Sequence, residues 1–201
     1  MVSASSLAAP GTGKTTIVNA LYRKGIQHGE QWMLAAPTGR AAKRLSESTK
    51  QAALTVHRLL KTNGPNHQFQ HNATNPLTAD VVLIDEASML DIWLLDALVC
   101  ALPIGCRLIL VGDVDQLPSV GPGQILRDII DSETIMVARL SEIYRQAKDS
   151  NIVHNAHKVN QGRLPISCEQ DPNASSNQDF FILNREDPEH ALKTLLNVIG
   201  S

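Results

Sequence analysis

The segment Ala8-Ala9-Pro10-Gly11-Thr12-Gly13-Lys14-Thr15 constrains this chain most, because it places glycines, a lysine and a threonine directly before a helix-forming stretch. With this spacing, backbone N–H groups can surround phosphate oxygens, a lysine can neutralise them, and a threonine hydroxyl can bind Mg²⁺. A helix that starts there adds the positive end of its dipole. The segment predicts a phosphate-binding loop. The alternative is a glycine-rich turn before a core helix. The predicted phosphate contacts are Pro10, Gly11, Thr12, Gly13, Lys14, Thr15 and Thr16.

Short apolar runs alternate with longer segments of helical period along the chain. Near-continuous apolar runs are typical of strands buried on both faces, and their alternation with helices indicates a parallel sheet. We therefore expect an α/β fold with helices on both faces of the sheet. The clearest strands are expected at residues 32–36, 81–85, 108–112 and 135–138, with one more at 2–7. Helices are expected at residues 14–25, 39–48, 91–101, 123–131 and 151–161. Residues 61–79 predict a long surface loop or a small hairpin.

One apolar strand, Val81 to Asp85, ends in the acid pair Asp85-Glu86. At a strand tip, Asp85 could hold Mg²⁺ through water, and Glu86 could orient and deprotonate a water that attacks a phosphoanhydride. An isolated Asp-Glu pair is more often a solvated turn. Its position after an apolar strand and a phosphate loop favours the catalytic interpretation.

Two further polar side chains follow later strands. Gln116 comes after the strand at 108–112, at the edge where open α/β sheets bind ligands, so its amide could contact a γ-phosphate or the attacking water. The alternative is a capped turn. Arg145 follows the strand at 135–138 and could stabilise charge on the γ-phosphate. By spacing alone, Arg145 is more often a surface ion-pair residue.

Four sequence blocks, at residues 8–16, 34–45, 82–91 and 111–123, occur in an order that resembles the RecD-like family of superfamily 1 DNA helicases. The likeness continues through Thr55-Val56-His57-Arg58-Leu59-Leu60 and Leu140 to Gln146, and covers most of residues 7–165. It implies a RecA-like phosphate-loop (P-loop) NTPase fold and an ATP-dependent motor that moves 5′ to 3′ on single-stranded DNA. Ala8 and Ala9 depart from the family's usual glycines.

The resemblance also implies roles for individual residues. Lys14 and Thr15 would bind ATP and Mg²⁺. Asp85 would be a metal ligand, and Glu86 would activate water. By the same resemblance Gln116 and Arg145 would sense the γ-phosphate. The DNA strand would be contacted by Pro37, Thr38, Gly39, Arg40 and His57.

Residues 38–61 are unusually basic, with a single acid, Glu47, among six cations. Such side chains near a helix N-terminus suit backbone phosphates without reading sequence, and salt should weaken the binding. The alternative is a solvated helix face. The six cations are Arg40, Lys43, Arg44, Lys50, Arg58 and Lys61.

The chain is expected to divide into a motor domain at 1–165, a polar linker at 166–179 and a strand-helix region at 180–201, in which Asp187 and Pro188 open the helix. No motif of a second motor domain follows residue 165, so we expect a fragment of a longer motor. Partners would be single-stranded DNA and either exonuclease subunits or the second motor domain. The alternative function is a non-catalytic module that binds nucleotide or DNA, or docks to exonuclease subunits.

Composition bounds the remaining possibilities. A net charge of -2 favours neither a nucleic acid nor a membrane partner over the whole chain. Three cysteines without metal spacing, no secretory signal and no long apolar run indicate a cytoplasmic protein without a membrane span. The paired histidines His154/His157 and His67/His71 lack a third ligand for zinc. No guanine-recognition signature supports a GTPase, and a small-molecule kinase would not explain the basic segment.

Overall fold

The computed structural model describes residues 2–6, 14–63, 68–138, 150–167, 179–184 and 187–199. The chain forms two compact units, Met1–Tyr144 and Arg145–Ser201, and each is described by itself. Several predicted features lie outside the described residues. They are Pro10, Gly11, Thr12 and Gly13 of the phosphate loop, Arg145, His67, and most of the linker predicted at 166–179.

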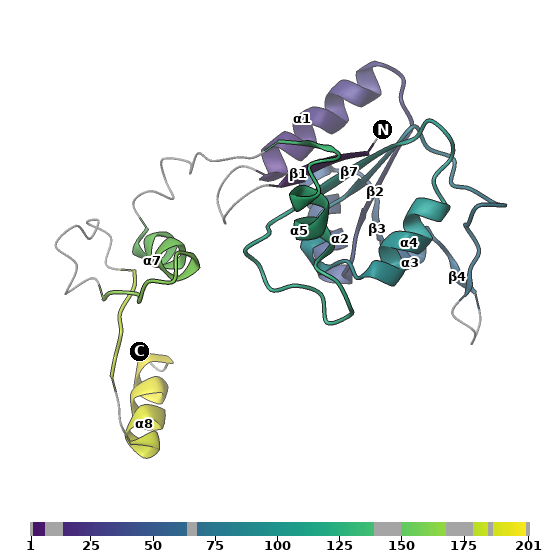
Figure 1. Ribbon diagram of the computed structural model, residues 1–201. Coiled ribbons are helices and arrows are strands. Elements are labelled where there is room, and N and C mark those ends of the chain that lie inside the picture. Colours follow the sequence, from purple (N-terminus) through teal and green to yellow (C-terminus); the bar gives the residue numbers. More distant parts are fainter. Residues whose placement is uncertain are drawn as a thin grey trace. The chain divides into compact units, whose positions relative to one another are not determined.

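The first unit is built on a six-stranded sheet in which every pairing is parallel (Figure 1). The strand order is β3-β2-β6-β7-β1-β8. The predicted parallel sheet is therefore confirmed, and each of the expected strands forms. Their bounds are β1 Val2–Ser6, β2 Trp32–Ala36, β3 Ala53–Thr55, β6 Val81–Ile84, β7 Arg107–Gly112 and β8 Met136–Val137.

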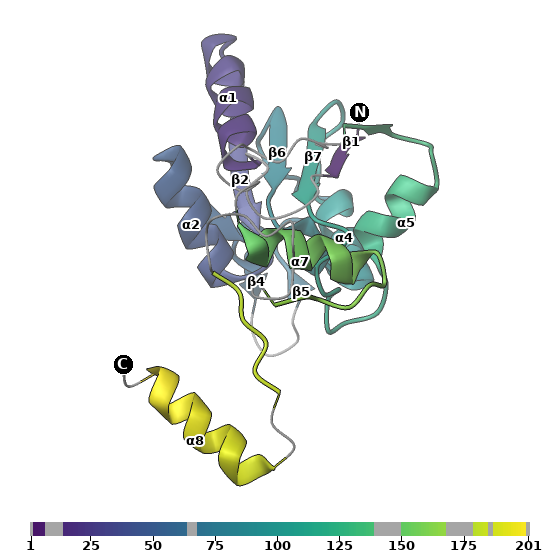
Figure 2. The same cartoon turned by 90° about the vertical axis from the view of Figure 1, so that its left-hand side faces the viewer.

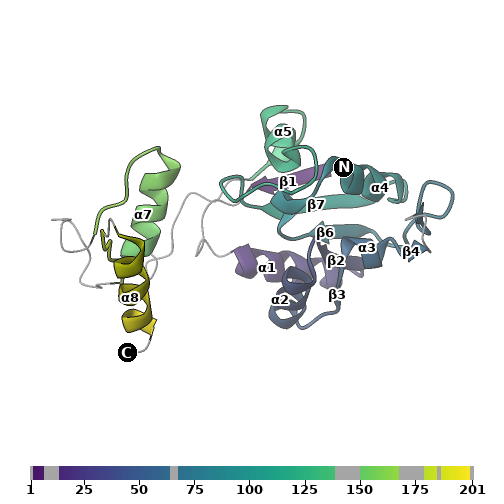
Figure 3. The ribbon, with the colours of Figure 1, turned by 90° about the horizontal axis from the view of Figure 1, so that it is seen from below.

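Helices cover both faces of this sheet, as predicted (Figure 3). Side chains alternate along a strand, so Leu83 of β6 packs with Val18 and Leu45 on one face, whereas Ile84 packs with Leu98 on the other. α1 and α2 cover the first face, and α3, α4 and α5 cover the second. The bounds are α1 Lys14–Gln27, α2 Gly39–Thr49, α3 Val56–Leu59, the 3₁₀ helix η1 Ala87–Met89, α4 Ile92–Cys100 and α5 Ile125–Asp131.

The strand order determines which connections become neighbours. β7 lies between β1 and β6, and β2 lies on the other side of β6. Because all strands are parallel, their carboxyl ends meet at one edge of the sheet. The residues that follow β1, β2, β6 and β7 are therefore gathered at this edge although they are far apart in the sequence.

Two short elements beside β2 were not predicted. β3 has three residues and pairs with the last three residues of β2. α3 has four residues, and its N-cap is Thr55, whose Oγ1 accepts a hydrogen bond from Arg58 N at 3.2 Å. Such short elements lack the length that gives a clear period. The hairpin considered for residues 61–79 does form, from the antiparallel strands β4 (Thr62–Asn63) and β5 (Gln68–Phe69).

Within its described residues, the second unit contains the helices α7 (Asn151–Asn160) and α8 (Pro188–Ile199). Asp179 accepts hydrogen bonds from Ser150 Oγ (2.6 Å) and Asn151 N (2.9 Å) at the start of α7. The helix predicted after Asp187 is confirmed, since a carboxylate oxygen of Asp187 accepts a hydrogen bond from His190 N at 3.2 Å. The predicted strand-helix region at 180–201 places its strand at residues 180–183, and this prediction is wrong. Residues 180–183 form no strand, and no described segment pairs with them. The division at residue 165 stays a prediction.

Candidate functional site at the carboxyl edge of the sheet

The first turn of α1 carries the part of the predicted phosphate loop that the structure describes. Lys14 is the first residue of this helix and is partly buried, whereas Thr15 and Thr16 are exposed. The first backbone N–H groups of a helix lack intrahelical partners and carry a positive partial charge. The first turn of α1 therefore has donors and a cation suited to phosphate oxygens.

Asp85 lies directly beyond the end of β6. Its backbone N donates to Ala35 O at 2.9 Å, which continues the bonding between β6 and β2, and its Oδ1 accepts from Glu86 N at 2.9 Å. Burial raises the pKa of Asp85. The bond from Glu86 N and the nearby ammonium of Lys14 oppose this shift, and the negative charge of Glu86 adds to it. Lys14 and Asp85, 71 residues apart, thus act on each other across the β1 and β6 ends.

Glu86 is held in an uncommon conformation. Its φ of 54° and ψ of 41° are left-handed, which costs a non-glycine residue of order 1 kcal/mol or more and is found most often at functional positions. Its Oε2 is buried, and no described residue forms a hydrogen bond to it. A buried carboxylate oxygen without a partner costs stability unless a further group completes it. The Oε2 atom of Glu86 could therefore accept a hydrogen bond from a bound water or ligand.

The loop after β7 carries Gln116 to the same edge. Asp113 is only 2% exposed, and its Oδ1 accepts from Asp115 N at 3.0 Å, while its backbone O accepts from Gln116 N at 3.3 Å. These bonds form a tight turn, so the capped turn considered for this segment does exist. The Gln116 side chain is nevertheless exposed and available to contact a ligand.

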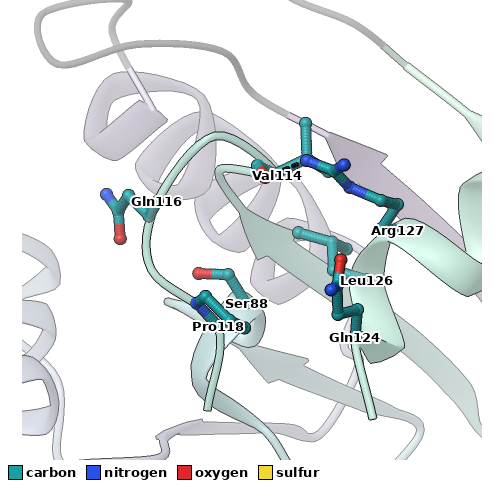
Figure 4. Close-up of a pocket in the computed structure, with 7 residues that line it drawn as sticks. All are labelled: Ser88, Val114, Gln116, Pro118, Gln124, Leu126 and Arg127. Carbon is teal, nitrogen blue, oxygen red and sulfur yellow. Dashed lines mark hydrogen bonds between the residues drawn. The ribbon is translucent and has the colours of Figure 1, made fainter. Parts of the chain in front are cut away.

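A pocket of about 230 Å³ lies between this loop, η1 and α5 (Figure 4). Arg127 Nη2 donates to Val114 O at 3.0 Å, which ties α5 to the loop two residues before Gln116. Ser88 is 8% exposed, and its Oγ has no hydrogen-bond partner among the described residues. Sequence reasoning missed Ser88 and Arg127. The one local signal was that Ser88 follows Glu86 by two residues. The pocket is lined by Ser88, Val114, Gln116, Pro118, Gln124, Leu126 and Arg127.

The predicted DNA contacts fall in two places. Pro37, Thr38, Gly39 and Arg40 follow β2, and Thr38 begins α2, with Oγ1 accepting from Ala41 N at 3.2 Å. Gly39 and Arg40 are exposed. His57 is exposed on α3, and its ring lies 5.9 Å from the ring of Phe69 on β5, centroid to centroid. The first set lies at the edge with Lys14 and Asp85, and His57 lies on the other side of edge strand β3.

The described residues contain no group of three or more histidine, cysteine, aspartate or glutamate side chains that could hold a metal ion. No described helix combines the length and apolar character needed to cross a membrane.

In the parallel sheet, β7 lies between β1 and β6. Lys14 at the start of α1 lies near the acid pair Asp85-Glu86 at the end of β6. These features define an α/β fold of the RecA-like P-loop type. The chain belongs to the AAA domain family, whose model matches residues 4–175. The structure is similar to that of Pif1 helicase from Candida albicans, with a TM-score of 0.62 and 21% identity over 98% of this chain and 51% of that one.

Curated relatives confirm the predicted RecD-like character. The ATP-dependent RecD2 DNA helicase of Deinococcus radiodurans is 41% identical over 156 residues, and the RecBCD enzyme subunit RecD of Mycobacterium tuberculosis is 32% identical over 214 residues. The matches cover 78% and 93% of this chain. They cover 21% of the first relative and 36% of the second, so the chain spans well under half the length of either.

The raised pKa of Asp85 leads to a prediction about stability. The folded chain holds the Asp85 proton more tightly than the unfolded chain, so stability falls as pH rises from the ordinary carboxyl pKa through the raised one. With no nucleotide or Mg²⁺ present, Asp85→Asn should raise the melting temperature at pH 7 by about 2 °C or more. The gain should shrink as pH falls toward the ordinary aspartate value. Asp96→Asn, on the exposed side of α4, is the matched control. A lower melting temperature for Asp85→Asn at pH 7 would contradict the assignment.

Proposed function

We propose that this chain is the ATP-binding and ATP-hydrolysing motor domain of a DNA helicase that depends on single-stranded DNA. The observation that carries the proposal is the meeting of Lys14 with Asp85 and Glu86 at the edge where β1 and β6 end. A cation that begins a helix, beside a half-buried acid, suits a nucleotide triphosphate with its counter-ion. The names of the two relatives, an ATP-dependent DNA helicase and a subunit of the RecBCD enzyme, agree with this chemistry.

The residues present fit Mg²⁺. Burial raises the pKa of the Asp85 carboxyl group, and the charge of Lys14 offsets this rise only in part. Thr15 offers an exposed hydroxyl one residue from Lys14. Oxygen ligands of this kind are those that Mg²⁺ prefers. When bound, the ion would neutralise charge on the β- and γ-phosphates. In this proposal Thr15 and Asp85 hold it, and Lys14 with residues 10–13 and Thr16 binds the phosphates.

Glu86 is the proposed catalytic base. Water attacks the γ-phosphorus, the bond from phosphorus to the ADP oxygen breaks, and Glu86 takes the proton of the attacking water. The buried Oε2 of Glu86 supports this role, because no described residue forms a hydrogen bond to it and a water could do so. Gln116 would contact the γ-phosphate or the attacking water from the loop after β7. Arg145, outside the described residues, would stabilise charge on the γ-phosphate.

Single-stranded DNA is the proposed polymer. Pro37, Thr38, Gly39 and Arg40 present a capped helix start and a cation beside the nucleotide edge, which suits a backbone phosphate. His57 would contact the same strand farther along. Because α2 starts where β2 ends, and β2 neighbours β6, DNA at Arg40 would be one strand away from the acid pair.

The activity of the whole protein is a wider proposal. We place this chain in a motor that moves 5′ to 3′ in the cytoplasm, either as a stand-alone helicase or beside exonuclease subunits. A second motor domain would close over ATP, and the chain alone would then hold the chemistry without unwinding DNA.

Phosphate release with and without single-stranded DNA tests the proposal. The wild-type chain should hydrolyse ATP, single-stranded DNA should raise the rate, and Lys14→Ala should remove both activities by weakening ATP binding. Lys24→Ala, at the other end of α1, controls for loss of a lysine from this helix. A wild-type chain that binds ATP but stays inert with DNA would support the non-catalytic module instead.

A further inference from the structure

The two helical faces of the first unit differ sharply in charge. Helices α1 and α2 together carry six cations and one acid, while α3, α4 and α5 together carry two cations and three acids. The net charge of -2 hides this division. The exposed cations of these two helices are Arg23, Lys24, Arg40, Lys43 and Arg44, and exposed Lys50 directly follows α2. The acids of the second face are Asp96, Asp128 and Asp131.

The basic segment 38–61 is therefore not one surface. α2 packs through Leu45 against the same core as α1, whereas α3 packs through Val56 and Leu59 into the core on the opposite side of the sheet. The edge strand β3 separates them. Arg58 and Lys61 lie with α3, and the cations of α2 join those of α1 instead.

α1 and α2 lie side by side and run in the same direction (Figures 2 and 3). Among the described residues, one ion pair involves these cations, Lys43 with Glu47 at 3.9 Å, and both of its side chains are largely exposed. Such an exposed pair contributes little. Arg23, Lys24 and the α2 cations therefore form a positively charged surface, here called the α1/α2 face.

Among the described residues, no exposed aromatic ring lies on the α1/α2 face for bases to stack on. The aromatic side chains near it, Tyr22 and Trp32, are partly buried and pack edge to face, with ring centroids 5.9 Å apart. Proteins that hold single strands combine a basic groove with exposed aromatic rings on which bases stack. A basic face without exposed rings suits the regularly spaced phosphates of a duplex. The 11 residues of α2 extend roughly 16 Å, which matches about five phosphates of one duplex strand.

We infer that the α1/α2 face binds the phosphate backbone of duplex DNA, independently of sequence. The inference goes beyond the proposed function, which places a single strand at the sheet edge and requires no duplex contact. The site consists of Arg23 and Lys24 on α1 with Lys43 and Arg44 on α2. It would hold the duplex next to the motor while the single strand passes the edge.

The test is the affinity of the whole chain for a blunt duplex and for a single strand of equal length, measured by fluorescence anisotropy over a salt series. The double variant Arg23→Gln/Lys24→Gln avoids every residue placed in the nucleotide or single-strand site. It should weaken duplex binding roughly tenfold at moderate salt and reduce the salt slope by about one for each lost cation. Single-strand affinity, ATPase without DNA and melting temperature should stay unchanged.

The control Arg163→Gln/Lys193→Gln removes two exposed cations from the second unit and should leave duplex affinity unchanged. An equal loss of duplex and single-strand binding in the α1 variant would mean that the face follows the single strand, and would overturn the inference. Unchanged duplex binding by the α1 variant would also overturn the inference, and an acidic protein would then be the partner to test for the α1/α2 face. If the wild-type chain hydrolysed no ATP but bound duplex DNA normally, the proposed function would fail and the inference about the α1/α2 face would stand.

Discussion

Glu86→Gln should abolish ATP turnover while ATP binding persists. The carboxamide keeps the size of the side chain but cannot accept the proton of the attacking water, and loss of a general base lowers rates by about 10²- to 10⁴-fold. The phosphate contacts proposed for Lys14 and the first turn of α1 do not involve Glu86. Single-turnover phosphate release and nucleotide affinity, measured on the same preparation, separate the two effects.

Glu133→Gln is the matched control for this substitution. Glu133 is an exposed glutamate that also has a left-handed backbone, with φ of 52°, and it follows α5 away from the acid pair. The exchange should leave turnover unchanged there. A Glu86→Gln variant that keeps wild-type turnover would remove Glu86 as the base. A variant that loses ATP affinity as well would show that Glu86 serves binding more than proton transfer.

Among the substitutions of a described glycine by alanine, Gly25→Ala should lower the stability of the first unit most. A Cβ at Gly25 would lie 2.0 Å from Trp32 Nε1, so the indole would have to leave its place. Trp32 would then lose its bond to Glu30 (2.9 Å) and its edge contact with Tyr22. We expect a net loss of about 2 to 3 kcal/mol, because overpacking exceeds the gain in helix propensity. The melting temperature should fall by roughly 4–12 °C.

Gly39→Ala controls for the glycine exchange, since a Cβ there would meet open space. Its melting temperature should stay the same or rise slightly. In a Trp32→Ala background the penalty of Gly25→Ala should largely vanish, because the clashing ring is gone. An equal penalty with and without Trp32 would rule out the clash as its cause.

Much of the fold could be predicted because the strands are buried on both faces. A strand such as β6 has no solvent-facing side, so its four residues are all apolar, and the polar residues that follow it mark its end. The same contrast placed Asp85 and Gln116 at strand ends. The exceptions were β3, α3 and residues 180–183, which are too short for their period to specify a structure.

The candidate site was predictable in part. Residue types after β1, β2, β6 and β7 indicated phosphate, metal and water chemistry, and the family resemblance supplied roles that stay predictions. Ser88 and Arg127 could not be found in this way. Ser88 places a buried hydroxyl in the pocket and Arg127 donates a hydrogen bond to Val114 O, and neither feature leaves a pattern in the neighbouring residues.

By itself, the sequence determined the identity of the elements and the order of the chemical groups along the chain, because helix starts and buried strands depend on residues within a few positions of each other. Only the tertiary structure decided which groups meet. The insertion of β7 between β1 and β6 sets how Lys14 lies relative to Asp85. The packing of α2 and α3 on opposite faces divides one basic segment between two surfaces. Both outcomes depend on pairing and burial between distant segments, which local spacing does not encode.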